Sequence, residues 1–456
     1  MRVPVAPGRL PFLGHTLPML RGRHRYTARL RERAEIVEVD LGPLPTYFVT
    51  SPRFTHQVLV TDGPRFRKGI MFDRFEPFLG NGLILSNGAF HRRQRRMVQP
   101  AFHRDRLAGY TEIMADAATR AVDSWRPGEV RVVEDDMQAL AVTIVGEALF
   151  TTEIGPRAIE EIRRSMFEVT KNGMLMALLP GALAKVPIPP NRRFHRAIGR
   201  IQAVVGEVVA RRRAEGVDRG DLLSILLQAQ DEDTGEGMSD RQVFDEVVGL
   251  LSAGIETTAL ALAWAFHELS RRPDVADRVH AEVDEVLAGR GVVGRGVAGR
   301  GVAGRGVVTF EDLPKLVYTR QVVQEVLRRY PIWILMRRTV EEVNFDGFVV
   351  PAGAEVIISP DALHHDPRTF ADPGYFDPDR WQPERAAGVP KGAYIPFGGG
   401  ARQCVGNAFA LNEAVVVLAT VASRYRLRPV PGKPVRTKYT TAPYPSGLLL
   451  TVVPRT

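Results

Sequence analysis

The sequence predicts a mainly α-helical fold with small β-sheets, an α+β single domain, on three observations. Strand-like sequence is confined to residues 36–50 and to the region after Pro331. No clean linker interrupts the 456 residues, and a hydrophobic content of 45% is enough for a large core. Most of the rest has apolar residues at helical spacing, around 108–124, 137–150, 158–170, 196–215, 240–271, 274–288 and 317–329, with a last helix at 405–424. We therefore expect one domain over residues 1–456.

Two segments are expected to depart from helix. Residues 36–50, IVEVDLGPLPTYFVT, contain two β-rich runs around a Gly-Pro-Leu-Pro turn, which predicts a hairpin. LLPGALAKVPIPPNRR at 178–193 predicts a proline-rich connection between two helices.

A third segment lacks the apolar face that packing requires. GRGVVGRGVAGRGVAGRGV, residues 289–307, repeats a short glycine- and arginine-rich unit. We expect a flexible surface loop, because such a composition does not bury a face. A basic arm for an acidic partner is the alternative, and a tolerated repeat expansion is the favoured interpretation, since long loop insertions cost little stability.

Composition and charge limit the class of protein. The formal net charge of +9 suits an acidic partner. The arginines are spread over the chain without a helix-turn-helix, zinc-ligand or aromatic-basic motif, so we predict no nucleic-acid partner. One cysteine excludes an internal disulfide. The N-terminus has no uninterrupted apolar signal region, and apolar runs such as 414–422 are about half the length of a membrane helix. We expect no membrane span and a cytoplasmic protein.

The single cysteine, Cys404, lies in FGGGARQCVG at residues 397–406. A lone buried cysteine is usually a small hydrophobic residue. Here the surrounding glycines allow a tight turn beside something flat and bulky. A helix follows directly, and its positive end would stabilise a thiolate. Cysteine thiolate is also one of the standard axial ligands of haem iron.

FGGGARQCVG fits in full the Phe-x-x-Gly-x-Arg-x-Cys-x-Gly signature and so resembles the cytochrome P450 haem-thiolate monooxygenases. The resemblance implies haem b, bound between the long central helix and the helix after the cysteine loop. Cys404 would be the iron ligand, and the other cofactor-binding residues of this loop would be Phe397, Arg402 and Gly406.

Two further motifs are similar to those of the family and imply support of the haem pocket. Glu325-Val-Leu-Arg328 resembles its Glu-x-x-Arg, although i,i+3 ion pairs also occur on ordinary solvated helix faces. Phe376-Asp-Pro-Asp-Arg380-Trp381 resembles the stretch whose arginine joins that pair. An arginine fork accepts a carboxylate in two contacts, so Glu325, Arg328 and Arg380 would hold the cysteine loop to the core.

Ala253-Gly-Ile-Glu256-Thr257-Thr resembles the family's motif on the distal side of the haem, where O₂ binds. Small residues in a helix can simply permit close packing, and a threonine can hydrogen-bond its own helix. A glycine followed by acid and hydroxyl residues is nevertheless costly in a helix interior unless a local distortion is used. By the resemblance, Thr257 would hydrogen-bond the iron-bound peroxo group and Glu256 would relay protons; these are the predicted catalytic residues.

Haem carries two propionates, so its site needs cations from several parts of the chain. His91-Arg-Arg-Gln-Arg95 resembles a family pair, and Arg337 lies in the corresponding segment after Pro331. Each alone reads as an ordinary surface cation. Together with Arg402 they predict clamps for carboxylates. The sequence leaves open whether Arg337 or Arg338 points inward.

The resemblance implies a soluble bacterial enzyme that takes NAD(P)H-derived electrons from a ferredoxin and a ferredoxin reductase. The basic stretch 91–96 would face the acidic ferredoxin. The regions 70–90, 166–186, 331–336 and 440–447 are apolar and would line a pocket for an apolar small molecule, although the same residues could be core.

The overall similarity is to actinomycete biosynthetic members, so we expect hydroxylation or successive oxidation of a terpenoid, with fatty acid or polyketide as the alternative substrate. A non-oxygenating isomerase or dehydratase, or a haem sensor, is the alternative function, but neither needs the pair Glu256-Thr257.

Overall fold

The computed structural model describes residues 2–455 except 12–13, 22, 42–44, 151–154, 179–187, 289–305, 333 and 440–441. The main helices are α1 (Thr16–Arg21), α2 (Arg23–Arg33), α3 (Pro52–His56), α4 (Ile70–Asp73), α5 (Glu76–Leu79), α6 (Gly88–Val98), α7 (Arg104–Asp123), α8 (Val133–Phe150), α9 (Pro156–Leu178), α11 (Pro189–Glu215), α12 (Leu222–Gln228), α13 (Asp240–Arg271), α14 (Pro273–Leu287), α15 (Val317–Arg329), α16 (Pro360–His364), α17 (Pro383–Ala386) and α18 (Asn407–Arg424).

The strands of the described part of the chain are β1 (Ile36–Val39), β2 (Thr46–Val49), β3 (Phe66–Lys68), β4 (Val130–Val132), β5 (Leu335–Thr339), β6 (Val343–Phe345), β7 (Phe348–Val350), β8 (Glu355–Ile358), β9 (Tyr425–Pro429), β10 (Arg436–Tyr439), β11 (Pro443–Ser446) and β12 (Leu449–Pro454). Short single turns, among them Gln57–Thr61 and Gly400–Arg402, connect some of these elements.

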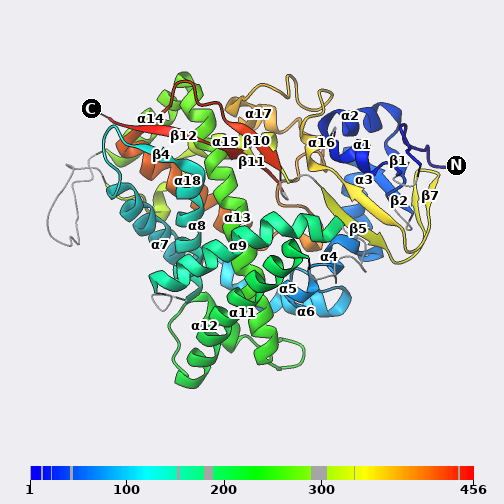
Figure 1. Cartoon of the computed structure of the whole chain (residues 1–456), viewed down its shortest axis with the longest axis horizontal. Helices are drawn as coiled ribbons and strands as arrows, with labels where there is room; N and C mark the ends of the chain where they lie inside the picture. Colours follow the sequence, from blue (N-terminus) through cyan, green and yellow to red (C-terminus); the bar gives the residue numbers. More distant parts are fainter. Residues whose placement is uncertain are drawn as a thin grey trace.

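The largest sheet joins distant parts of the sequence in the order β1-β2-β8-β5-β3. β1 and β2 are antiparallel, which confirms the predicted hairpin. β8 adds to β2 in parallel, and β5 carries β3 on its outer edge. This sheet and the N-terminus lie at one end of the molecule, and most of the long helices lie at the other (Figure 1).

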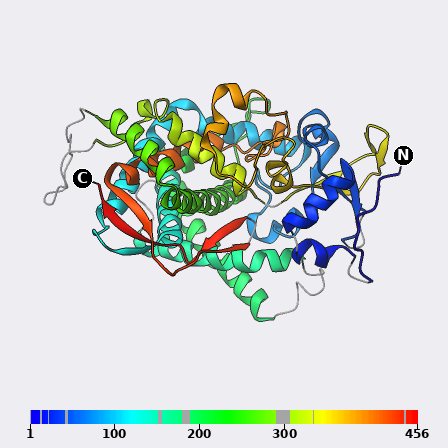
Figure 2. The same ribbon diagram turned by 90° about the horizontal axis from the view of Figure 1, so that it is seen from above.

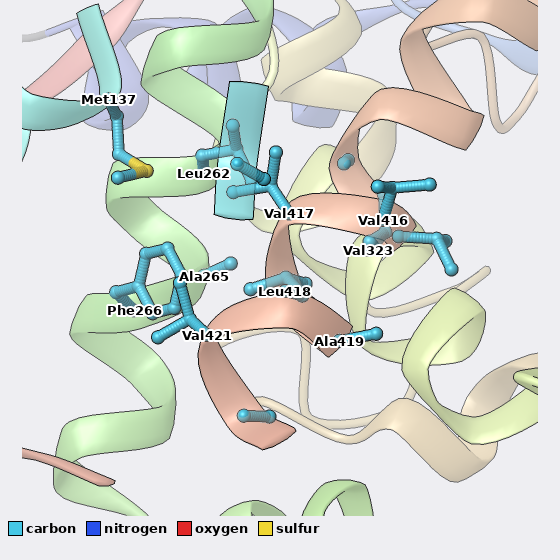
Figure 3. Packing of buried hydrophobic residues seen from close by; sticks show 14 of the residues in the cluster. Met137, Leu262, Ala265, Phe266, Val323, Val416, Val417, Leu418, Ala419 and Val421 are labelled. Carbon is cyan, nitrogen blue, oxygen red and sulfur yellow. The ribbon is translucent and has the colours of Figure 1, made fainter. Parts of the chain in front are cut away.

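Helix α13 crosses the middle of the helical part (Figure 1, Figure 2). The hydroxyl of Ser239 accepts from the backbone N–H of Gln242, whose side chain accepts from the N–H of Ser239, so the helix begins with a complete capping box. One apolar cluster then joins α13 to α7, α8, α15 and α18. Figure 3 shows residues of α13 facing residues of α18 in this cluster: Leu262, Ala265 and Phe266 against Val417, Leu418 and Val421.

By length and composition, α13 is also the one helix among the described residues that could cross a membrane, but more than half of its apolar window is buried inside the protein. Its hydrophobicity therefore serves the core of the fold.

The expected helices are present, and one predicted boundary is wrong. Residues 178–193 were expected to form a proline-rich connection, but α9 continues to Leu178 and α11 already begins at Pro189. Proline is well tolerated in the first helical turn because its missing N–H needs no partner there. Residues 289–305 of the repeat at 289–307 lie outside the described residues, so its expected flexibility stays a prediction.

Candidate active site

The cysteine loop is a tight turn directly before α18. The N–H of Cys404 donates to Phe397 O at 2.9 Å, and the N–H of Gln403 donates to Gly400 O at 3.0 Å. Gly400 has φ +65°, and a Cβ there would lie 2.0 Å from Leu59 O. The loop therefore requires glycine at this position, because any side chain would collide with the backbone of the preceding segment.

The thiol of Cys404 lies deep in the fold but faces accessible space. Burial raises the pKa of Cys404, while the backbone N–H of Gly406 and the charge of Arg95 lower it by less. The side chain is nevertheless exposed. A thiol in this position is available to a ligand, and coordination to a metal ion removes its proton outright.

Behind the loop, Glu325, Arg328 and Arg380 form a buried charged group. Glu325 and Arg328 on α15 have fully buried side chains and share two hydrogen bonds, Nε to Oε2 at 2.9 Å and Nη2 to Oε1 at 2.8 Å. Arg380 Nε lies 3.5 Å from Glu325 Oε1. The indole N–H of Trp381 and the backbone N–H of Asp377 also donate to the Glu325 carboxylate. The structure thus brings together the three predicted supporting residues.

This group is connected to the cysteine loop through His364. Arg328 Nη1 donates to His364 O at 2.8 Å, and the backbone N–H of Ile395 donates to His364 Nε2 at 3.0 Å. Ile395 O in turn accepts from the N–H of Gly398. Burial lowers the pKa of His364 to about 3, so its ring is neutral and can accept this bond.

The middle of α13 has one face that is open. Ala253 and Thr257, one helical turn apart, are exposed, whereas Ile255 and Thr258 between and beside them are buried. Exposed residues in the centre of a core helix mean that accessible space reaches this face. Glu256 is half-buried next to it.

The hydroxyl of Thr257 donates to Ala253 O at 2.7 Å, and α13 is helical from Asp240 to Arg271 without a break. The threonine therefore bonds back to its own helix, which is the plain alternative that the sequence left open, and the local distortion expected around Gly254 stays a prediction. A hydroxyl has one proton and two lone pairs, so Thr257 Oγ1 still presents acceptor sites to the open face.

A group of basic side chains, which we call the cationic cluster, lies beside the cysteine loop: Lys68, His91, Arg95, Arg337 and Arg402. Lys68 and Arg337 are paired residues of β3 and β5. Arg402 donates to Ser86 O and to Asn87 Oδ1, both at 2.9 Å, and Arg95 donates to Gln403 O.

These basic side chains have no carboxylate partner among the described residues, and each disfavours a positive charge on its neighbours. Burial and the neighbouring charge of Arg402 lower the pKa of Arg337 to about 10. Burial and the charges of Arg337 and Arg402 lower the pKa of Lys68 well below its usual value. Burial, followed by the charges of Arg402 and Lys68, lowers the pKa of His91 to about 3. Buried charges normally have partners, so the cluster is built for an anionic ligand.

Haem fits these residues. Its iron suits the accessible thiol of Cys404, and its two propionates suit the unpaired cations.

The structure also decides between two neighbouring arginines and shows residues that sequence reasoning missed. Arg337 belongs to the cationic cluster, whereas Arg338 is paired with Glu355 and Asp73. Lys68, and the contacts of Arg402 with Ser86 and Asn87, were not expected. The signal was weak, because Lys68 reaches the cluster only through the pairing of β3 with β5, which lie far apart in sequence.

The basic stretch 91–96 is only partly available to a partner. Arg93 and Arg96 are paired with Asp231 at 3.8 and 2.8 Å, and also with Glu236 and Asp233 at 3.2 and 2.6 Å. Arg92 is exposed and has no such pair among the described residues.

Comparisons with known proteins find relatives over almost the whole chain. A family model described as Cytochrome P450 matches residues 4–454. The chain is 44% identical to cyclooctat-9-en-7-ol 5-monooxygenase of Streptomyces melanosporofaciens, over 94% of this chain and 90% of that protein. It is 32% identical to pentalenene oxygenase of Streptomyces avermitilis, over 99% and 97%. The crystal structure of the cytochrome P450DA heme domain is similar, with a TM-score of 0.85 and 25% identity, over 100% of this chain and 98% of that one.

Proposed function

The chain belongs to the cytochrome P450 family and is a monooxygenase of that family, and from this premise we propose that it hydroxylates an apolar cyclic terpenoid. Two of its relatives are named for oxidation of such compounds, cyclooctat-9-en-7-ol and pentalenene. The observation that carries the chemistry is the cationic cluster beside an accessible cysteine, in a fold whose long helix α13 also has an accessible face at its middle.

The cofactor of the family is a haem held by cysteine thiolate, and we propose haem b. A c-type haem is attached through cysteines of a C-x-x-C-H motif, and the single cysteine of this chain does not lie in such a motif. Cys404 would hold the iron, and Arg337, Arg402, Lys68, His91 and Arg95 would surround the propionates. When bound, the haem would activate O₂.

The residues of the chain orient the reaction and control its protons. The hydroxyl of Thr257 donates its own proton to Ala253 O. Its oxygen can therefore accept a hydrogen bond from a protonated oxygen on the open face of α13. Glu256, the next residue, is half-buried and would carry protons between solvent and Thr257. The apolar side chains of the 70–84 segment, including Phe72, Phe75 and Leu79, pack beside the core and would exclude water from the substrate.

We further propose that a ferredoxin and its reductase deliver the NAD(P)H-derived electrons in the cytoplasm. The net charge of +9 and the exposed Arg92 support an acidic electron carrier.

Reconstitution with a ferredoxin system tests the activity and the substrate class together. With NADPH and O₂, we expect hydroxylated product from cyclic diterpene or sesquiterpene hydrocarbons, and none from a long-chain fatty acid. Efficient fatty-acid hydroxylation would overturn the terpenoid proposal.

Cys404→Ala tests the iron ligand. The reduced carbon monoxide complex of the native protein should show the red-shifted Soret band of thiolate ligation, and the variant should lose it. A variant with an unchanged spectrum would exclude Cys404 as the axial ligand.

Thr257→Ala tests the proton path. A hydrogen bond to a charged group contributes about 1.5–3 kcal/mol, so product formation should fall roughly 10- to 100-fold. NADPH consumption should continue and release hydrogen peroxide. Equal product per NADPH in both proteins would contradict this role.

A further inference from the structure

Residues 69–86, which we call the strap, leave the cationic cluster and return to it. The strap begins directly after Lys68 of β3, and it ends where Arg402 binds Ser86 O at 2.9 Å. At its start, the backbone N–H of Ile70 donates to Glu355 of β8 at 3.1 Å to Oε2 and 3.2 Å to Oε1. Both ends are therefore attached to fixed elements of the fold.

The far part of the strap is attached to α13 by two buried carboxylates. The backbone N–H of Asn81 donates to Asp245 Oδ2 at 2.9 Å, and the backbone N–H of Leu83 donates to Glu246 Oε1 at 2.8 Å. Asp245 and Glu246 are 5% and 2% exposed. Burial raises the pKa of Glu246 to about 7. Both carboxyl groups offer oxygens that accept the two backbone N–H groups, and a buried N–H left without an acceptor would be costly.

The sequence of the strap permits this close approach. Gly80 has φ +60°, and a Cβ there would lie 2.1 Å from Asp245 Cγ; a Cβ at Gly82 would lie 3.2 Å from Glu246 Cδ. Side chains at these two positions would push the strap away from α13.

Beyond the carboxylates, Ile84 of the strap packs beside the buried Gly249 of α13, one helical turn before the exposed Ala253. Ile84 Cδ1 lies 3.3 Å from the position of a Cβ on Gly249. Gly249, Ala253 and Thr257 follow one another at intervals of four residues and therefore lie on the same side of the helix. The strap thus borders the side on which Ala253 and Thr257 are exposed.

We propose that Asp245 and Glu246 are positioning residues that hold residues 80–84 of the strap beside the open face of α13 and so determine which substrates fit there and which carbon is oxidised. This inference rests on the proposed function, because it assigns the open face to the substrate. The two carboxylates act through the strap and touch no reacting atom.

Amide hydrogen exchange of the holoenzyme tests the attachment without turnover. Glu246→Leu removes the acceptor but keeps an apolar side chain of similar size, and it should speed exchange at Leu83 by about 10- to 100-fold. Asp245→Ala should do the same at Asn81. Asp240→Asn, an exposed carboxylate at the start of the same helix, is the matched control and should change neither amide.

Two conservative variants give the same test if Glu246→Leu or Asp245→Ala fails to fold. Glu246→Gln and Asp245→Asn retain an acceptor oxygen at nearly the same place, so exchange at the same two amides should rise by less than in the full deletions. Unchanged exchange at Asn81 and Leu83 in all four variants overturns the proposal.

Binding of two haem ligands of different size tests the effect on specificity. Imidazole needs little space beside the iron, whereas 4-phenylimidazole also occupies the space beside the strap. The ratio of their dissociation constants should change about threefold or more in Glu246→Leu, with the carbon monoxide spectrum unchanged. An unchanged ratio with faster exchange overturns the specificity role. A native protein without the thiolate spectrum would instead contradict the proposed function, and the exchange result would still report on the attachment.

Discussion

Arg328 and Arg337 are both buried arginines, but the chain neutralises only one of them. Arg328 has two hydrogen bonds to Glu325 and also donates to the backbone carbonyls of His364 and Pro373. Arg337 donates to Met336 O and lies next to Arg402 and Lys68. A buried charge whose partner belongs to the chain supports the fold, and a group of buried charges without one is reserved for a ligand.

The two regions should therefore respond oppositely to loss of charge. Removing one partner of a satisfied buried pair leaves the other uncompensated and is strongly destabilising. Removing one cation from a mutually repelling group relieves repulsion and costs binding of the anion.

The largest effect is expected at Glu325. Glu325→Ala leaves Arg328 and Arg380 without their carboxylate, and breaking a buried pair costs about 3–5 kcal/mol. Denaturant unfolding of the haem-free protein should show this loss, and the variant should also retain less haem because the link through His364 to Ile395 is weakened. If the free energy of unfolding falls by less than about 1 kcal/mol, which is the range of an exposed ion pair, Glu325 and its two arginines do not act as a buried charged group.

The pH dependence of stability should distinguish the regions next. The folded pKa of His91 is about 3, below its usual 6.5. The fold therefore favours the neutral ring. The contribution of His91 to the free energy of unfolding is complete above pH 6.5 and is lost as the pH falls toward 3. In the haem-free protein, the free energy of unfolding should fall by about 1.4 kcal/mol per pH unit across this window relative to His91→Gln.

Bound haem sharpens this comparison. Its propionates favour a charged His91, so the excess slope over His91→Gln should become smaller in the holoprotein. An equal slope with and without haem would contradict the assignment of the cationic cluster to the propionates.

Arg337→Met should affect ligand binding with little effect on the empty fold. The haem-free protein should be as stable as the native one or slightly more stable, because repulsion with Arg402 and Lys68 is relieved. Haem should bind roughly 10- to 100-fold more weakly, the value of a charge-assisted hydrogen bond. Titration of haem into both proteins measures this.

Arg338→Met is the matched comparison on the same strand. Arg338 is the partner of Glu355 and Asp73, so its loss should lower stability more than it lowers haem affinity. The reverse order of effects would exchange the roles of the two arginines.

The smallest effect is expected on the surface of α6. Arg92 is exposed, whereas Arg93 is paired with Asp231 and Glu236. Arg92→Ala should slow reduction by an acidic ferredoxin about threefold at low salt, and the difference should shrink at high salt. Arg93→Ala should change this rate less, and equal rates for Arg92→Ala and the native protein would remove α6 from the docking surface.

Local pattern in the sequence was enough for the elements and for the residues of each motif. Periodicity predicted the eight long helices because an amphipathic helix repeats its apolar residues every three to four positions. The i,i+3 spacing placed Glu325 and Arg328 on one face of α15, where they are found. The predicted hairpin at 36–50 needed only its two strands and their turn. These features depend on residues close together in the chain.

Contacts between distant residues were decided by the tertiary structure alone. The sequence by itself determined that Cys404 lies in a glycine-rich turn before a helix, because both depend on neighbouring residues. Whether Arg337 or Arg338 joins the cationic cluster depends on which face of β5 is turned toward Arg402, and adjacent strand residues point to opposite faces. Likewise, Lys68 reaches the cluster through β3–β5 pairing, and Asp245 and Glu246 meet the strap more than 160 positions away. Such partners are chosen by packing of the whole chain, for which local sequence carries no signal.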